Sequence, residues 1–382
     1  MDFDFTEEQS LLKDSLERLL ADRYSFEDRR KVLASPEGWS AEMWSRYAEM
    51  GLMALPFCEE DGGLGATPVE TMIVMEALGK TLALEPYFPT VVLGGGFLRF
   101  GGSAEQKAAF IPQIAAGELK LAFGHTERNS RYDLNHVETA AKKDGDAWLL
   151  SGRKSVVLGG DGADHIFVTA RTAGEARDEH GIGVFLIDGR AEGVSRRGYA
   201  NQDGQRAAEI TLDNVRVPAD RVFGDPENGL PLVRRVVDGA IAALCAEAVG
   251  AMSAMHQLTV DYLKVRKQFG VPIGAFQVLQ HKAVDMFVAI EQARSITLYA
   301  TMMADSDDED ERGRAMHAAK AEVGRAGRLV GENAIQLHGG VGMTMEYSVG
   351  HYFKRMTMID LTFGDHDHHL RALARRGGLF VA

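Results

Sequence analysis

Apolar residues recur at helical spacing along the first third of the chain. Thr6 and Gln9 fit a capping box at the start of one helix, whose apolar face carries four leucines: Leu12, Leu16, Leu19 and Leu20. Ser40 starts a second helix, the segment 67–70 a third and Ser103 a fourth. We expect these later helices to end near glycines, namely Gly51, Gly79 and Gly117.

From residue 120 to residue 222 the pattern changes to the alternation that is typical of β-strands. Asp144-Gly145 predicts a hairpin turn. The segments with the strand pattern are 137–141, 148–151, 166–170, 184–187 and 210–217. Long helical segments resume after Gly229, and the acidic run 305–311 is expected to be a solvated loop without a metal site.

The order of these elements predicts three domains. They are an α-helical domain at residues 1–119, a β-domain at 120–228 and a helical bundle at 229–382. With 382 residues, of which 45% are apolar, the chain is long enough to bury a large core.

Charge and targeting signals narrow the classes of function. The net charge of −13 argues against nucleic acid as a partner. No stretch approaches the roughly 20 apolar residues that cross a bilayer. The acidic start, MDFDFT, resembles no secretory or transit peptide, and Cys58 and Cys245 fit no disulfide or metal pattern. We therefore expect a cytoplasmic protein.

The run from Arg266 to Gly270 carries candidate binding chemistry. It combines a guanidinium fork, the aromatic face of Phe269 and a helix break, and Gln277 follows in the next helix. This set suits a phosphate beside a flat ring system. An alternative is purely structural, with Arg266 at a helix C-terminus and a plain turn after it.

A second stretch favours the binding interpretation. Gln336, Leu337 and His338 precede Gly339 and Gly340, and glycines let a backbone approach a bulky ligand. Together the two stretches resemble the C-terminal signatures of the acyl-CoA dehydrogenase family, whose members bind FAD. The resemblance covers the whole chain and implies an α+β fold: an N-terminal α-helical domain, a central β-barrel and a C-terminal four-helix bundle.

The resemblance also implies an activity and its participants. Family members remove two hydrogens across the α,β bond of an acyl-CoA thioester, and electron-transfer flavoprotein is the expected acceptor. A carboxylate base takes the α proton. A neighbouring subunit's flavin would be held by these residues: Arg266, Phe269, Gln277, Gln336, Leu337, His338, Gly339 and Gly340.

The share of the flavin site that a subunit provides for itself is altered. The family pattern T-E-P-x-x-G-S-D corresponds to residues 126–133, which keep Thr126 but carry Arg128, Arg131 and Tyr132 in place of proline, glycine and serine. The pattern G-Q-K-x-W-I-T corresponds to residues 152–158. Its stacking tryptophan is Val156 here and its threonine is Leu158.

The catalytic base is missing from both positions that the family uses. Phe363 stands where most members carry glutamate, and Ala240 stands at the alternative position, followed by Ile241 in place of an arginine. Asp238, Glu247 and Asp365 are the substitutes that remain. Asp365 is the nearest in sequence, although a structural role as a surface aspartate or in the first turn of a helix is the preferred interpretation. The catalytic residue is therefore left open.

Two other motifs are interpreted structurally. His366, His368 and His369 form a cluster in which His366 and His369 share one face of a C-terminal helix. Nothing elsewhere supplies further ligands, so no metal site is predicted. Gly94 to Gly96 lack the signature of a phosphate loop and are expected to form a tight helix junction.

These losses favour the small subunit of a heteromeric α2β2 enzyme similar to pimeloyl-CoA dehydrogenase, in which the large subunit would carry the base and bind the substrate. Four segments resemble such subunits: MDFDFTEEQ, PVETMIVMEALGK, GRKSVVLGGDGAD and FGDHDHHL. The expected pathway is fatty acid or dicarboxylate degradation, and the acyl chain is bulky or carries a distal carboxylate. Three alternatives stay open: a self-sufficient homotetramer with a relocated base, a flavin-free scaffold, and an oxidase or monooxygenase on the same fold.

Overall fold

The computed structural model describes residues 5–380, so the first four residues of the acidic start lie outside it. The chain divides into two compact units. The bundle unit comprises residues 1–31, 68–83 and 241–382, and the sheet unit comprises residues 32–67 and 84–240. This division into two units does not test the boundaries of the three predicted domains, which stay a prediction.

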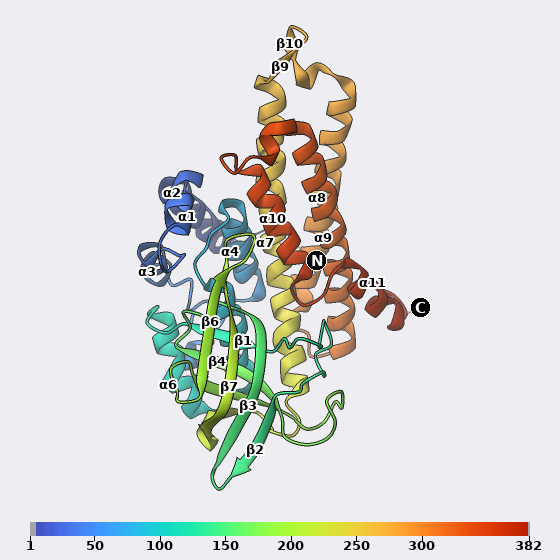
Figure 1. Ribbon diagram of the computed structural model, residues 1–382. Coiled ribbons are helices and arrows are strands. Elements are labelled where there is room, and N and C mark those ends of the chain that lie inside the picture. Colours follow the sequence, from blue (N-terminus) through green and yellow to red (C-terminus); the bar gives the residue numbers. More distant parts are fainter. Residues whose placement is uncertain (1–4, 381–382) are drawn as a thin grey trace. The chain divides into compact units, whose positions relative to one another are not determined.

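Within residues 5–380, the bundle unit is helical apart from its loops and one short hairpin. The long helix α9 packs against α8, α10 and α11, and α4 packs against α1 (Figure 1). The helices are α1 (Glu7–Arg23), α2 (Phe26–Leu33), α4 (Pro68–Thr81), the larger part of α7 (Leu230–Val265), α8 (Gln277–Met303), α9 (Glu309–His338), α10 (Val349–Leu361) and α11 (His366–Arg375).

Helix starts follow the side chains that the sequence singled out. The capping boxes of Thr6 with Gln9 and of Ser103 with Gln106 are both formed, which confirms these predictions. The acidic run 305–311 is only partly a loop, because α9 begins at Glu309. Asp308 caps that helix by accepting from the amides of Asp310 and Glu311. A carboxylate at a helix N-terminus satisfies free amides and the helix dipole.

Two glycines bring α4 and α7 unusually close within the bundle unit. A Cβ atom on Gly79 would lie 2.0 Å from the carbonyl oxygen of Glu247, and one on Gly250 would lie 1.9 Å from that of Glu76. Each glycine therefore admits the backbone of the other helix, and neither position has room for a side chain.

Helix α7 is long and apolar enough to cross a membrane by length and composition, although the sequence predicted no such segment. However, 83% of its most apolar window is buried, as in the core helix of a soluble protein. It is the one helix of this kind among residues 5–380.

The sheet unit contains an eight-stranded sheet in the order β6-β7-β3-β2-β4-β5-β8, with β1 pairing β4 in parallel. Its strands are β1 (Leu121–Gly124), β2 (Ala140–Asp144), β3 (Ala147–Leu158), β4 (His165–Arg171), β5 (Ile182–Asp188), β6 (Val194–Ala200), β7 (Arg206–Pro218) and β8 (Val222–Phe223). The β2–β3 hairpin turns at Gly145, as predicted. The strand expected at 137–141 begins only at Ala140, because the amide of Val137 bonds to the carbonyl of Ala176 outside the ladder.

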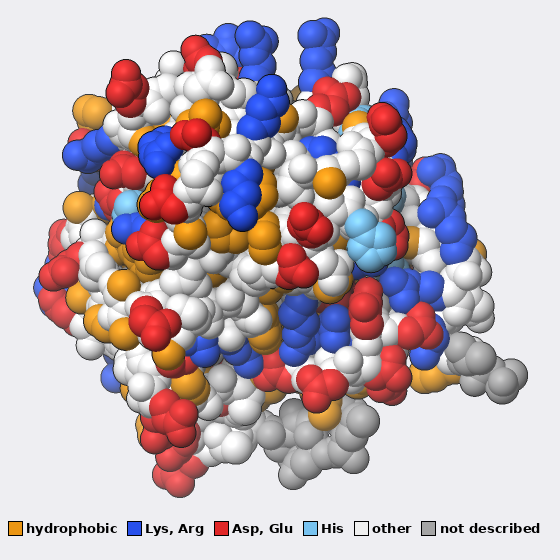
Figure 2. All heavy atoms as spheres, turned by 90° about the horizontal axis from the view of Figure 1, so that it is seen from below, with side chains coloured by type: hydrophobic (Ala, Val, Ile, Leu, Met, Phe, Trp, Pro, Cys, Tyr) orange, Lys and Arg blue, Asp and Glu red, His pale blue; other side chains and the backbone are white. Residues whose placement is uncertain are grey.

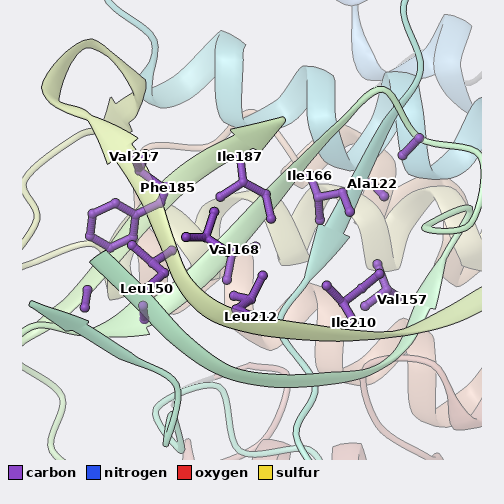
Figure 3. Close-up of a cluster of buried hydrophobic side chains, with 14 of the residues drawn as sticks. Ala122, Leu150, Val157, Ile166, Val168, Phe185, Ile187, Ile210, Leu212 and Val217 are labelled. Atoms are coloured by element: carbon purple, nitrogen blue, oxygen red, sulfur yellow. The ribbon is translucent and has the colours of Figure 1, made fainter. Parts of the chain in front are cut away.

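The core of the sheet unit lies between its strands. Figure 3 shows Leu150 of β3, Val168 of β4, Phe185 and Ile187 of β5 and Leu212 of β7 pointing toward one another, and all five are buried. Helices α3 (Ala41–Glu49), α5 (Gly95–Gly101) and α6 (Ala104–Ala115) complete the unit, and a π-helix at Phe88–Gly94 runs directly into α5. The segment 94–96 is thus helical, as the tight-junction interpretation requires.

Charges of both signs are interspersed on the surface. On the face seen from below, Lys and Arg alternate with Asp and Glu and with small apolar patches (Figure 2).

Candidate functional site

The turn between α7 and α8 projects from one end of the bundle unit (Figure 1). It is a hairpin of β9 (Lys267–Gln268) and β10 (Val271–Pro272), with Phe269 and Gly270 at its tip. Phe269 has a left-handed backbone, with φ of 54°, and is 91% exposed. An exposed aromatic residue in this strained conformation marks the turn as a candidate functional site.

Three polar side chains in this part of the bundle unit have no internal role. Arg266, Gln277 and Gln336 are exposed, and within residues 5–380 their side chains form no hydrogen bond or ion pair. Gln336 lies at the end of α9, where the ring of His338 stacks on Tyr262 of α7 with 4.5 Å between centroids. The two predicted signatures therefore converge at the ends of adjoining helices.

The second signature divides into buried and open positions. The side chains of Leu337 and His338 are buried, and His338 Nδ1 donates to the carbonyl of Ala334 at 2.8 Å. Burial lowers the pKa of His338. By contrast, Gly339 and Gly340 are exposed, and a Cβ atom on either would meet nothing within 4 Å. Only the glycine backbone and Gln336 are open to a ligand here.

The open groups fit one side of a dinucleotide such as FAD. A guanidinium without an internal partner suits a pyrophosphate, and glutamine amides suit carbonyl and hydroxyl groups. The exposed ring of Phe269 offers a stacking surface, and the glycines leave room for close approach. Arg266, Phe269, Gln277 and Gln336 are thus the residues that would hold the group.

In the sheet unit, Thr126 stands beside a buried ion pair. Its carbonyl accepts from the amide of Ser155 at 2.8 Å. Lys154 is fully buried and donates to Glu127 Oε1 at 2.6 Å. Burial lowers the pKa of Lys154 to about 8, although the negative charge of Glu127 acts in the opposite direction. Burial disfavours the ionised form of Glu127, but Lys154 and Thr139 outweigh that effect and lower the pKa of the carboxyl.

This ion pair fixes the loop on which Thr126 lies. Glu127 also accepts from the hydroxyl of Thr139 at 2.7 Å and from the amide of Glu138 at 2.7 Å. Both ends of the loop 127–139 are therefore tied to one carboxylate. Arg128 and Arg131 project from it, exposed and without an ion pair in the described part of the chain.

Val156 occupies a strained bulge two residues beyond Lys154. The β3–β7 register shifts between Lys154 and Val157, and Val156 has φ of 51° and is 44% exposed. A positive φ is a genuine outlier for a β-branched residue, and bulges often adjoin active sites. The amide of Val156 donates to Glu209 Oε1 at 3.3 Å, and the Tyr199 hydroxyl donates to the same oxygen at 2.9 Å. The bulge and the hydrogen bond to Glu209 thus hold the backbone of Val156 in place, although the family's tryptophan side chain is absent at this position.

The positions considered for a base hold no free carboxylate. Phe363 is half-buried with φ of 57°, and Ala240 is fully buried. Glu247 is engaged by Arg355, whose Nε and Nη2 donate to its two oxygens at 2.6 Å each. Asp365 is the N-cap of α11 and accepts from the amide of His368 at 2.8 Å. Asp238 is half-buried and also interacts within the chain.

The C-terminal histidines serve the fold. His366 Nδ1 donates to the carbonyl of Ala321 at 2.6 Å, and His369 Nε2 donates to that of Phe363 at 3.1 Å. Among residues 5–380, no group of three or more His, Cys, Asp or Glu side chains is placed to hold a metal ion.

Sequence reasoning missed the buried charged residues around these positions. Lys154 lies 27 residues from Glu127, and Arg355 lies 108 residues from Glu247. The sequence around Lys154 is polar, with Arg153 and Ser155 on either side, and it gives no sign of burial or of a partner.

Comparison with known proteins places this geometry in context. The chain matches the models of the acyl-CoA dehydrogenase N-terminal domain at residues 6–118, middle domain at 122–215 and C-terminal domain at 227–378. It is 31% identical over 308 residues to "Probable acyl-CoA dehydrogenase FadE25" of Mycobacterium tuberculosis, covering 80% of this chain and 79% of that protein.

Two solved structures are also similar. The steroid ACAD Tcur3481-Tcur3483 is 30% identical with a TM-score of 0.88, and the match covers 97% of each chain. The ChsE4-ChsE5 complex from Mycobacterium tuberculosis is 24% identical with a TM-score of 0.90 and covers 100% of each chain, a likeness that shows the fold.

Proposed function

Because the chain belongs to the acyl-CoA dehydrogenase family, we propose that it is the small subunit of a heteromeric acyl-CoA dehydrogenase. Family members are FAD-dependent oxidoreductases that act on a CH–CH bond of an acyl-CoA thioester. In this proposal the chain, with domains at 1–119, 120–228 and 229–382, supplies part of the FAD site to a catalytic large subunit in an α2β2 assembly.

The observation that carries the proposal is the absence of a free carboxylate at each position considered for the base. Phe363 and Ala240 are apolar, Glu247 forms an ion pair with Arg355, and Asp365 caps a helix. Abstraction of an α proton needs a positioned base with a suitable pKa. The large subunit would therefore provide this group.

The open groups of the bundle unit define what this chain contributes. When bound, FAD supplies the hydride acceptor. Arg266 would hold its pyrophosphate, the amides of Gln277 and Gln336 would bind polar atoms, and Phe269 would cover an apolar surface. Because the side chains of Arg266, Gln277 and Gln336 form no hydrogen bond or ion pair within residues 5–380, they are available to a flavin held mainly by another subunit.

The names of two structural neighbours support an assembly of unlike chains. Both Tcur3481-Tcur3483 and ChsE4-ChsE5 join two proteins in one name. The bulky acyl substrate, electron-transfer flavoprotein as acceptor, a role in fatty acid or dicarboxylate degradation and a cytoplasmic location belong to the same proposal.

A self-sufficient homotetramer is the second candidate, and the strained backbones favour it. Val156 and Phe363 both keep a left-handed φ at positions where the family places a flavin contact and a base. Such strain persists when the surrounding structure specifies it, so part of the chain's own site geometry is retained.

Flavin content per chain and native mass separate the two candidates. The chain is purified alone and then co-expressed with proteins encoded beside it. About one FAD per pair of unlike chains, with little flavin on the chain alone, supports the small subunit. Full FAD occupancy in a homotetramer, and bleaching of that flavin by an acyl-CoA under anaerobic conditions, would establish the self-sufficient enzyme instead.

A further inference from the structure

The loop that carries Phe363 is held to α9 and α11 by side chains that the proposed function does not use. Lys320 of α9 is fully buried, and its Nζ donates to the carbonyls of Asp360 at 2.8 Å and Gly364 at 2.6 Å. His369 Nε2 donates to the carbonyl of Phe363 at 3.1 Å. The carbonyl groups of Phe363 and Gly364 thus each accept a hydrogen bond from a buried side chain, His369 and Lys320 respectively.

The proton positions of this cluster follow from the acceptors. A carbonyl only accepts, so His369 carries its proton on Nε2, and its Nδ1 is the acceptor in the 2.8 Å contact with His317 Nδ1. His317 must therefore donate from Nδ1. Burial lowers the pKa of His317 to about 4 and that of His369 well below its usual value, so both rings stay neutral at pH 7. The result is a directed relay from His317 through His369 to the loop.

Steric fit fixes the loop as tightly as the hydrogen bonds. Gly364 has φ of 118°, and a Cβ atom there would lie 2.6 Å from His369 Nε2. Just before the loop, a Cβ atom on Gly324 of α9 would lie 2.2 Å from Oδ1 of Asp360, near the C-terminus of α10. Close packing therefore borders the segment in which Phe363 keeps its left-handed φ of 57°.

We propose that Lys320 and His369, supported by His317, are positioning residues that set the direction of the side chain at position 363. The loop 361–365 is then a preserved mount for an acid–base residue, on which an apolar ring replaces the carboxylate. This inference rests on the proposed function only in taking position 363 as the place of the lost base.

Amide hydrogen exchange of the peptide region 361–368 tests the proposal on the purified protein, without any need for flavin or substrate. Lys320→Met keeps the length of the side chain and removes the donor. We expect exchange in this region to rise at least about tenfold, as expected for a local opening, while α4 and α8 remain protected. Lys31→Met, at a lysine whose side chain is 77% exposed in the same unit, is the control and should change nothing.

A second pair of variants, at His369, tests the same proposal without changing Lys320. His369→Leu should speed exchange in the same region, and His369→Gln should restore protection because its amide can donate to the carbonyl of Phe363. Unchanged exchange in both Lys320→Met and His369→Leu would overturn the proposal. Equal loss of protection in the Leu and Gln variants would do the same, because it would show that only ring packing matters.

The two hypotheses fail in different experiments. A homotetramer with full flavin would remove the small-subunit role but leave the exchange result intact. Loss of the exchange effect would remove the positioning role and leave the flavin stoichiometry untouched.

Discussion

Glu247 and Arg355 form a buried ion pair with two parallel hydrogen bonds of 2.6 Å. Both side chains are nearly excluded from solvent, at 5% and 7% exposure. Breaking such a pair leaves one uncompensated charge in a medium of low polarity. The pair therefore removes Glu247 from the set of possible bases and makes it part of the bundle core.

Arg355→Met should accordingly destabilise the protein by about 3–5 kcal/mol, the usual result of removing one partner of a buried pair. The double variant Glu247→Gln/Arg355→Met should recover a large part of that loss, because no buried charge remains. Urea unfolding followed by circular dichroism measures both. A single variant that is as stable as the double would contradict the buried-charge argument.

Arg266→Ala should reduce FAD retention in whichever complex forms, because the guanidinium has no partner among the residues that the structure describes and is the group that suits a pyrophosphate. A roughly tenfold weaker retention corresponds to about 1.4 kcal/mol. Lys264→Ala is the matched control, since Lys264 is a nearby cation that pairs with Asp261 at 3.7 Å. Flavin absorbance per mole of complex after gel filtration is the measurement, and equal flavin content in the two variants would count against the assignment.

Phe363→Glu should add a carboxylate at the base position without making the isolated chain active. Val156 and Leu158 still lack the aromatic and hydroxyl groups expected around a flavin. Anaerobic mixing with an acyl-CoA should leave any bound flavin oxidised, as in the Phe363→Leu control. Bleaching of the flavin in the Glu variant alone would show that the missing base was the sole defect.

Gly250→Ala should destabilise the protein by about 3 kcal/mol, because overpacking forces backbone shifts. The added methyl group would lie 1.9 Å from the carbonyl oxygen of Glu76. Gly239→Ala in the same helix meets nothing within 4 Å and should instead stabilise it by about 0.5–1 kcal/mol, the helix preference of alanine over glycine. Thermal unfolding of the two variants gives opposite signs if α4 and α7 approach as closely as described.

Burial lowers the pKa of Lys320 to about 8, which gives stability a specific dependence on pH. The unfolded chain holds this proton up to about pH 10.4 and so binds more protons than the folded chain above pH 8. The free energy of unfolding should therefore rise with pH between these values. Urea unfolding at pH 7.5 and 9.5, compared with Lys320→Met, isolates this contribution. A variant with the same rise as the parent would assign the effect to other groups, Lys154 included.

Local patterns predicted the helices well, because each helix start depends on side chains a few residues apart. The hydrogen bond from the amide of Gln106 to the hydroxyl oxygen of Ser103 is such a case. Strand limits were less predictable, since Val137 is apolar and buried but its amide bonds outside the sheet. The signatures around Arg266 and Gln336 were visible as short motifs. The pairs Glu127–Lys154 and Glu247–Arg355 were not, because sequence patterns give no information on which distant charges meet.

The apolar residues exposed at the tip of the bundle unit also affect the solubility of the chain on its own. Phe269 is 91% exposed, Met343 76% and Val278 63%, and such apolar residues are a liability in a solitary chain. In the proposed assembly a partner subunit would cover these residues. The chain expressed alone should therefore self-associate more readily than the complex, because apolar surface that stays exposed favours aggregation.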